Sequence, residues 1–361
     1  MKAGANTEKR FVWLDTVRIL ASFLVILSHF AYFFNFDRLR IIRNYIAEPT
    51  GNIGVFLFFA ISGYLVSHSL AKGGGIARFY KSKIVHIWLP FVTSYFFLSF
   101  LFIGLSVLRP EFIQQTPLGY VFLTGGDYGK FLFGLIPLEG LYSKAYWFVG
   151  EWFIGTLVTL YIISPILNEA AKRRPLVMLI FFTVLAIGVF FVAREELRFP
   201  FWFFLSRIPE FYLGMLLYLY RDWISIHFEY VFRSAFLVMV SVFAVRVFLS
   251  EDPFFGNRFV PSNPSSFLFS FPAIVFIFML CEKVNNRWDL SKFNEYSEIS
   301  YSFMLIQHVV LNVYFAYIQV KDLSKFGVLV SFLLVLGVTV YLAKKITAVY
   351  KPVEERLLRK K

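Results

Sequence analysis

The sequence is poor in charge and almost without cysteine. Only 16% of its 361 residues are Asp, Glu, Lys or Arg, and Cys281 is the single cysteine. A soluble domain carries about 25% charged residues, so this composition argues against a soluble protein. A single cysteine excludes an intramolecular disulfide, and we interpret Cys281 as an apolar core residue.

Long apolar runs take the place of charge. Hydrophobic residues make up 58% of the chain, which contains 48 phenylalanines. The runs are about 20 residues long, enough for a helix to cross the hydrocarbon core of a bilayer. The net charge of +13 would suggest nucleic acid as a partner of a soluble chain. In a membrane protein the distribution of Lys and Arg sets the orientation instead, so we expect a lipid bilayer and no nucleic acid as the partner.

The pattern predicts an all-α integral membrane protein, a bundle of about ten transmembrane helices. The first run is too long for a signal peptide and has no cleavage site, so we expect it to be retained. We predict one domain over residues 1–361 and no appended soluble domain. The predicted spans are 11–34, 51–71, 87–107, 147–167, 176–194, 201–220, 232–250, 266–282, 298–319 and 326–346.

The basic residues predict the orientation of the bundle. Lys and Arg are about twice as frequent in connections on the side of the N-terminus as on the other side, and such an excess marks the cytoplasm. We therefore expect both termini in the cytoplasm, Arg18 in the cytoplasmic half and His29 in the outer half. The basic stretch 344–361 is interpreted as a solvated or headgroup-facing terminus, with docking to acidic lipid or protein as the alternative.

The first span carries polar side chains on one face. Arg18 and His29 lie eleven residues apart in an otherwise apolar run. That spacing is close to three helical turns, so both share a face, roughly 16 Å apart along the axis. Asp15 precedes Arg18 by one turn, within reach of an i,i+3 ion pair. Ionisable residues inside a span usually face the bundle interior or an aqueous cavity.

Each of these residues has a structural and a chemical interpretation. His29 is either a general base for a hydroxyl group or an imidazole hydrogen-bonded to a backbone carbonyl. It lacks the neighbouring ligands that a metal site needs, so no metal is predicted. Arg18 with Asp15 is either a neutral structural pair or an anion site in which Asp15 fixes the arginine side chain.

A basic segment interleaved with aromatic residues precedes the third predicted span. Residues 72–86 begin with a lysine and three consecutive glycines and include Lys81, Lys83 and His86. The segment is either a cytoplasmic anchor or a phosphate-binding rim, in which the i,i+3 pair Lys83 and His86 faces one way.

Later spans contain further polar residues. Arg207 and Glu210 lie three apart in the sixth span, as a structural clasp or a cavity lining. Glu151 and Trp152 open the fourth span near the outer surface, where such residues are often interfacial. His308 in the ninth span has the same alternatives as His29.

Short motifs in a fixed order resemble one family. Over essentially its whole length the chain resembles the acyltransferase-3 family, the multi-span membrane O-acyltransferases that modify cell-surface sugars. Two motifs depart from the family pattern: KIVH (83–86) replaces an Arg-x-x-Arg pair, and Met304 replaces a tyrosine, with His308 one residue late. The matching segments are LDTVR (14–18) with His29, FFAISGYL (58–65), Trp152-Phe153 with Tyr161 and Pro165, Arg207 with Glu210-Phe211 and Gly214, and Ser300-Tyr301 before His308.

The resemblance implies an O-acyltransferase of the bacterial inner membrane. The implied reaction moves an acyl group, usually acetyl from acetyl-CoA, to a hydroxyl of an exopolysaccharide, an O-antigen or a similar cell-surface or lipid-linked sugar. His29 would deprotonate the acceptor hydroxyl or carry the acyl group as an acyl-imidazole. Acyl-CoA would be a co-substrate without a metal. Its phosphates would meet Arg18, supported by Asp15, and Lys81, Lys83 and His86.

The remaining polar residues are assigned to the acceptor or the oxyanion. Ser62, Tyr64 or Arg207 would stabilise the oxyanion. The predicted substrate-binding residues are Ser62, Tyr64, Glu151, Trp152, Arg207, Glu210 and His308. The alternative function is a transporter or flippase of a lipid-linked glycan, which also needs intramembrane charges and a cavity. A regulatory membrane partner with a degenerate site is a third interpretation.

Overall fold

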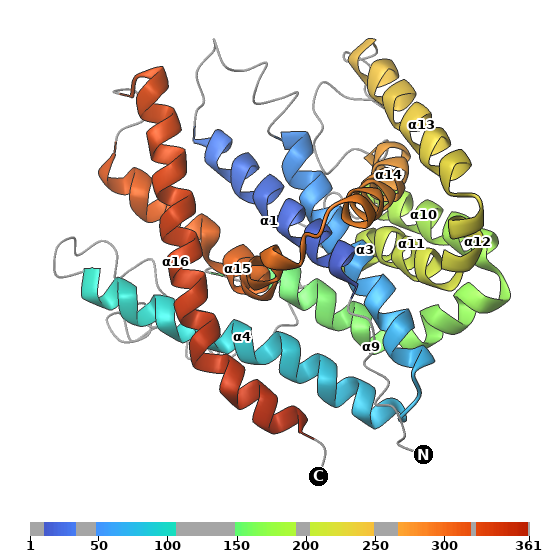
Figure 1. Cartoon of the computed structure of the whole chain (residues 1–361), viewed down its shortest axis with the longest axis horizontal. Helices are drawn as coiled ribbons and strands as arrows, with labels where there is room; N and C mark the ends of the chain where they lie inside the picture. Colours follow the sequence, from blue (N-terminus) through green and yellow to red (C-terminus); the bar gives the residue numbers. More distant parts are fainter. Residues whose placement is uncertain are drawn as a thin grey trace.

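The protein is described here by a computed structural model. The structure describes residues 11–33, 48–105, 149–192, 203–248, 266–318 and 323–359, and every regular element within these ranges is helical (Figure 1). The α-helices are α1 (Val12–Tyr32), α3 (Glu48–Ala71), α4 (Ile76–Leu105), α9 (Glu151–Arg173), α10 (Pro175–Val192), α11 (Ile208–Leu219), α12 (Arg221–Ile226), α13 (Phe228–Phe248), α14 (Ser266–Arg287), α15 (Asn294–Tyr317) and α16 (Lys325–Leu358).

Eight helices in the described part of the chain are long and apolar enough to cross a bilayer, and the predicted all-α membrane architecture is confirmed. Two predicted spans are not among these eight helices. Span 176–194 corresponds to α10, and span 201–220 to the 12-residue α11. A 3₁₀ turn, Phe204–Arg207, precedes α11, and Pro209 stands in its first turn. Twelve residues rise about 18 Å, less than a bilayer core of about 30 Å. Ten full spans are therefore not confirmed.

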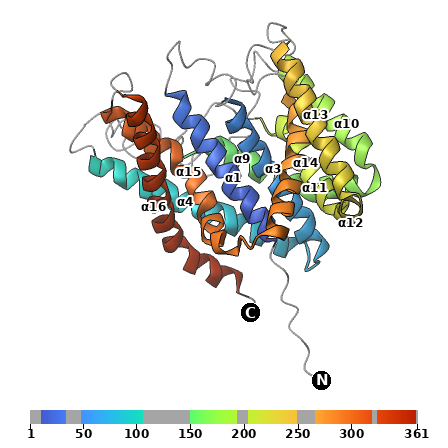
Figure 2. The same cartoon turned by 45° about the horizontal axis from the view of Figure 1, so that its top comes forward.

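Helix α1 lies at the centre of the bundle. It packs against α3, α14 and α15, and α3 in turn packs against α11. Figures 1 and 2 show α1 between α3 and α15, with α4 and α16 crossing nearby and α13 at the edge beside α14. The polar residues of the first span are thus surrounded by other helices, as expected for ionisable groups within a membrane.

Helices α3 and α11 approach each other at two glycines. A Cβ atom added at Gly63 would lie 1.8 Å from the carbonyl oxygen of Phe211. A Cβ added at Gly214 would lie 1.9 Å from the carbonyl oxygen of Ala60. Only a residue without a side chain fits at either position, and small residues are what allow membrane helices to pack backbone to backbone.

We expect Gly214→Ala to destabilise the fold. The added methyl group forces α3 and α11 apart, and overpacking of a tight core costs roughly 1–3 kcal/mol. Thermal unfolding of the detergent-solubilised protein should begin at a lower temperature than in the parent. Gly337→Ala is the control, because nothing lies within 4 Å of a Cβ added there. Equal unfolding temperatures for both variants would contradict the close approach.

Helix α4 begins well before the predicted third span. It starts at Ile76, because Gly73, Gly74 and Gly75 form the turn after α3 with φ angles of 73°, 99° and 82°. This region of backbone conformation favours glycine. The basic residues predicted to lie before residue 87 therefore belong to the first turns of a continuous helix and project from one rigid element.

The first turns of α1 and the last turns of α16 lie at the same end of the bundle. Ser297 at the start of α15 donates to Asp15, and its neighbour Glu298 forms an ion pair with Lys351 of α16. We call this the Arg18 end and the opposite end of α1 the His29 end. Which end faces the cytoplasm stays a prediction from the Lys and Arg distribution.

Candidate active site

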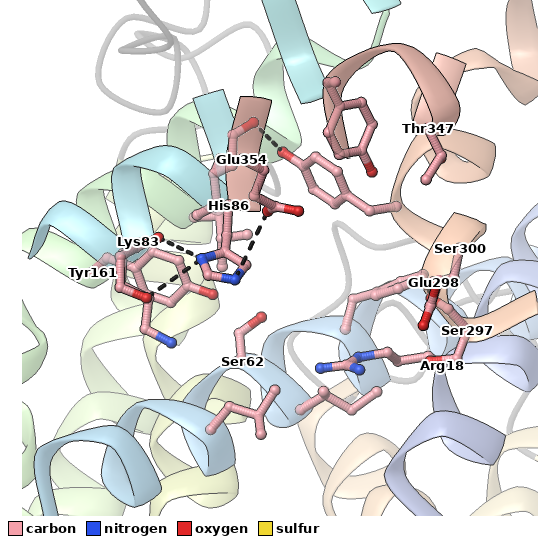
Figure 3. A pocket seen from close by; sticks show the side chains of 18 of the residues that line it. Arg18, Ser62, Lys83, His86, Tyr161, Ser297, Glu298, Ser300, Thr347 and Glu354 are labelled. Atoms are coloured by element: carbon pink, nitrogen blue, oxygen red, sulfur yellow. Dashed lines mark hydrogen bonds and ion pairs between the residues drawn. The ribbon is translucent and has the colours of Figure 1, made fainter. Parts of the chain in front are cut away.

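A cavity of about 480 Å³ opens at the Arg18 end, between α1, α3, α4, α9, α15 and α16 (Figure 3). One part of its wall is apolar and comes mainly from α3 and α9: Phe58, Ile61, Leu65, Ile87, Phe153 and Leu157. The rest is polar: Arg18, Ser62, Ser82, Lys83, His86, Tyr161, Ser297, Glu298, Ser300, Tyr301, Thr347, Tyr350, Lys351 and Glu354.

Arg18 reaches this cavity from α1. Its Nη1 lies 3.0 Å from Oδ1 of Asp15, which confirms the predicted i,i+3 pair. The same Oδ1 accepts from the hydroxyl of Ser297 at 2.6 Å, and Asp15 is buried. The Arg18 side chain is 30% exposed, and Figure 3 shows its guanidinium group beside Ser62. Asp15 therefore holds Arg18 from behind while other guanidinium donors face the cavity.

Lys83 and His86 line the same cavity from α4. The Nζ of Lys83 lies 5.3 Å from the ring centre of Tyr161, within cation–π range. His86 donates from Nδ1 to the carbonyl oxygen of Ser82 at 2.7 Å, and its Nε2 lies 3.8 Å from Oε1 of Glu354. Two of the predicted phosphate-rim residues thus line the same cavity as Arg18.

Lys81 does not join them. It is exposed and is not part of the cavity lining. Residues two apart on a helix point in different directions, so Lys81 cannot face the cavity when Lys83 does. The predicted contact of Lys81 with the same ligand has no support in the geometry of this cavity.

Helix α16 also contributes to the cavity, which the sequence patterns did not predict. Thr347, Tyr350, Lys351 and Glu354 line the cavity, and Lys351 forms an ion pair with Glu298 of α15. Part of the stretch 344–361, interpreted as a solvated or headgroup-facing terminus, thus lines the cavity instead. Their spacing of three and four residues is that of one helical face, and this periodicity beyond residue 346, the predicted end of the last span, was the available signal.

His29 lies at the other end of α1 and does not line this cavity. Its Nδ1 is 2.6 Å from Nε2 of Gln307 in α15. The imidazole is exposed, whereas Gln307 is buried. The ring of His308 is 6.3 Å from that of His29, edge to face. Gln307 was also missed, although it occupies the position of the histidine in the motif that begins at Ser300-Tyr301.

Arg207 and Glu210 form a clasp rather than part of the cavity. Both side chains are fully buried, and Nη1 of Arg207 lies 3.2 Å from Oε1 of Glu210. The guanidinium carbon is 5.2 Å and 5.6 Å from the ring centres of Phe56 and Phe267. Neither charge lines the cavity, so the predicted oxyanion and substrate-binding roles of this pair have no support in the geometry.

Three further predicted substrate-binding residues lie away from the cavity, whereas Ser62 lines it. Tyr64 is buried among aromatic rings, 5.4 Å from Trp13 and 5.2 Å from Tyr218. Glu151 is buried, not solvated, and accepts a hydrogen bond from the backbone N–H of Val149 at 2.9 Å.

Trp152 packs edge to face against Phe153, with 5.9 Å between the ring centres. Tyr64, Glu151 and Trp152 thus support the walls of the bundle.

Comparison with known proteins identifies the family. Residues 11–343 match the family model described as "Acyltransferase domain". The chain belongs to this acyltransferase family. It is similar to an O-acetyl transferase of Shigella phage Sf6, with 22% identity over 314 residues, 82% of this chain and 85% of that protein. No solved structure matches the chain.

The family confirms that the protein is a membrane acyltransferase, as the resemblance in the sequence predicted. In this acyltransferase, two kinds of chemistry lie at opposite ends of α1. Cations converge on a cavity at one end, and an exposed imidazole with a buried partner lies at the other. Within the described residues, no three His, Cys, Asp or Glu side chains come together as metal ligands.

Proposed function

We propose that this acyltransferase moves an acyl group, acetyl in the first instance, from acyl-CoA to a hydroxyl of a cell-surface or lipid-linked sugar. The acceptor is a bacterial exopolysaccharide, an O-antigen or a similar glycan, and the enzyme resides in the inner membrane. The observation that carries the proposal is the division of α1. Arg18 faces a cavity lined with cations, and His29 is exposed three turns further along the same helical face.

The cavity at the Arg18 end has the chemistry of a donor site. The phosphates of coenzyme A need cations and hydrogen-bond donors. Arg18 and Lys83 supply the cations, Lys351 is a further cation that is paired with Glu298, and hydroxyl groups such as Ser300 and Tyr301 surround them. Arginine suits phosphate because its planar group donates two parallel hydrogen bonds. The apolar wall from α3 and α9 would accommodate the pantetheine arm.

His29 would act on the acceptor. In the proposed step, Nε2 of His29 takes the proton of the acceptor hydroxyl while the oxygen attacks the thioester carbonyl carbon. The tetrahedral intermediate then expels the thiolate of coenzyme A, which takes the proton back from Nε2. The products are the O-acyl sugar and coenzyme A. A transient acyl-imidazole on His29 is the alternative order of the same bond changes.

The length of α1 suits a donor and an acceptor that arrive from opposite sides of a membrane. Arg18 and His29 are separated by roughly 16 Å along the helix axis. An extended pantetheine arm would carry the thioester from the cavity along this helix to the His29 end. The sugar would then never need to cross the bilayer.

The direct test combines purified protein with cells. Protein in detergent or nanodiscs, supplied with acetyl-CoA labelled in the acetyl group, should release coenzyme A and transfer label to a glycan extract from the host. Mass spectrometry of surface glycans should show an acetyl group that disappears when the gene is deleted. Movement of a lipid-linked glycan across the membrane without any use of acetyl-CoA would contradict the proposal and favour a flippase.

Lys83 and Lys81 form a matched pair for locating the donor. Lys83→Ala should raise the KM for acetyl-CoA roughly tenfold, because one charge-assisted contact to a phosphate is worth about 1.5 kcal/mol or more. Lys81→Ala should leave this KM unchanged, since its side chain lies outside the cavity. Steady-state kinetics with acetyl-CoA varied measures both. Equal effects of the two substitutions would place the donor elsewhere.

A further inference from the structure

Gln307 is placed to control which nitrogen of His29 is basic. It comes from α15, is only 2% exposed and approaches Nδ1 of His29 to 2.6 Å. The imidazole itself is exposed. Gln307 therefore lies behind the ring, where it contacts His29 but not a substrate on the open side. Such a residue acts on the reaction only through the imidazole.

The side-chain amide can meet Nδ1 in two ways. With Nε2 of Gln307 toward the ring, the amide donates and Nδ1 accepts, so the neutral imidazole carries its proton on Nε2. Both ring nitrogens are then occupied, and neither can take a proton from a hydroxyl. A half-turn of the amide brings Oε1 to the same place without a change of shape. Nδ1–H then donates to Oε1, and Nε2 of His29 presents a free lone pair to the open side.

The choice between the two arrangements comes from the chemistry of the base, because only the second leaves a free lone pair on Nε2 of His29. With Nε2 toward His29, the Oε1 atom of Gln307 is buried and has no hydrogen-bond partner among the described residues. An unsatisfied buried acceptor costs about 1–3 kcal/mol. The half-turn gives this oxygen the Nδ1–H of His29 as its donor and moves the amide N–H group of Gln307 into the partnerless position, so each arrangement leaves one polar group of the amide unsatisfied. Among the described residues, His308 is a further titratable side chain near the ring, with 6.3 Å between the ring centres.

We propose that Gln307 is the positioning residue of His29. In the active enzyme its Oε1 accepts from Nδ1–H, which keeps Nε2 of His29 deprotonated and directed at the acceptor hydroxyl. This inference rests on the proposed role of His29 as a general base, and it assigns the selection of the tautomer to a residue for which the sequence patterns predicted no role. Gln307 touches neither donor nor acceptor.

Two substitutions separate an accepting partner from a donating one. Gln307→Glu keeps the size and can only accept when ionised, whereas Gln307→Met keeps most of the volume and does neither. We expect Gln307→Met to lower kcat roughly 10- to 100-fold, the scale of a lost buried hydrogen bond, with the KM for acetyl-CoA unchanged. Gln307→Glu should retain activity, and its rate should fall off on the acidic side at a higher pH, because a carboxylate favours the protonated imidazole.

Tyr314→Phe is the matched control. Tyr314 lies in the same helix and donates to the hydroxyl of Ser331 at 2.8 Å, so the substitution removes a comparable contact between helices without touching His29. Its kcat and pH profile should equal those of the parent. The amount of each variant in the membrane and its unfolding temperature distinguish a positioning effect from a loss of fold.

The outcomes separate this inference from the proposed function. Full activity of Gln307→Met, alongside inactive His29→Ala, would overturn the positioning role and leave the base intact. Loss of activity in both Gln307→Met and Gln307→Glu, with normal folding, would overturn the accepting role. An active His29→Ala would instead remove the base, and with it the proposed mechanism.

Discussion

Replacement of His29 by alanine is expected to abolish acyl transfer while the protein still accumulates in the membrane. A positioned general base contributes typically 10²–10⁴-fold to the rate, and an acyl-imidazole pathway would lose its nucleophile altogether. The imidazole is exposed, so its removal leaves no large cavity in the core. Surface-glycan acetylation in cells and transfer from labelled acetyl-CoA in vitro both measure the loss.

His227→Ala is the control for a general effect of removing a histidine. His227 is also exposed, stacks on Trp223 with 4.5 Å between ring centres, and lies at the end of α12. It should leave acetylation at the level of the parent. Full acetylation by a normally abundant His29→Ala variant would eliminate both the direct and the acyl-imidazole mechanism.

The second large effect is expected for Arg18→Ala. Arg18 combines a charge held in place by Asp15 with guanidinium donors that face the cavity. Loss of a charge-assisted, partly buried phosphate contact is worth about 1.5–3 kcal/mol, so the KM for acetyl-CoA should rise roughly 10- to 100-fold. Asp15 would also lose the cation at 3.0 Å and keep the hydrogen bond from Ser297 of α15.

Separate measurement of the KM for acetyl-CoA and of kcat decides whether Arg18 binds the donor. If Arg18 formed only a structural pair, its loss would lower the unfolding temperature and the amount of active protein. The affinity of the remaining folded protein for acetyl-CoA would not change. Arg173→Ala removes another arginine from a helical ion pair, with Glu169 at 3.0 Å, far from the cavity lining. Arg173→Ala should change neither the KM for acetyl-CoA nor kcat. An unchanged KM in folded Arg18→Ala protein would remove Arg18 from the donor site.

Two pairs of side chains join helices at the Arg18 end, in the wall of the cavity assigned to the donor. His86 faces Glu354, and Lys351 pairs with Glu298, so two carboxylates lie in the wall of a cavity assigned to phosphates. The carboxylate of Glu298 is already paired with a cation from another helix. These pairs hold α16 against α4 and α15, and Arg18 and Lys83 remain the cations best placed for the donor.

Much of the membrane fold followed from residue type and spacing alone. Apolar runs of bilayer length predicted the helices. The hydrocarbon core offers no water to the backbone N–H and C=O groups, and a helix forms these hydrogen bonds within its own segment. The pair Asp15 and Arg18 and the shared face with His29 followed from helical geometry, which depends only on sequence separation. The short α11 was not predicted, because hydropathy does not distinguish a buried helix from a spanning one.

The partners of the polar residues were decided by contacts between distant helices. Asp15 and Ser297 are 282 residues apart, and His29 and Gln307 are 278 apart, so no local pattern links them. Packing also placed the other candidates. Lys83 and His86 line the same cavity as Arg18, whereas Lys81 lies outside it. Arg207 and Glu210 are buried in the core.

The sequence by itself determined which helix carries the chemistry, because ionisable residues inside a span are costly and their spacing along α1 is fixed by the helix. Only the tertiary structure decided what each of them faces. Arg18 meets a cavity whose far wall is the end of α16, and His29 meets an amide that can select its tautomer. The direction in which each side chain points and the residues that it contacts depend on how the helices pack against one another. The residues that determine this packing are spread over the whole chain.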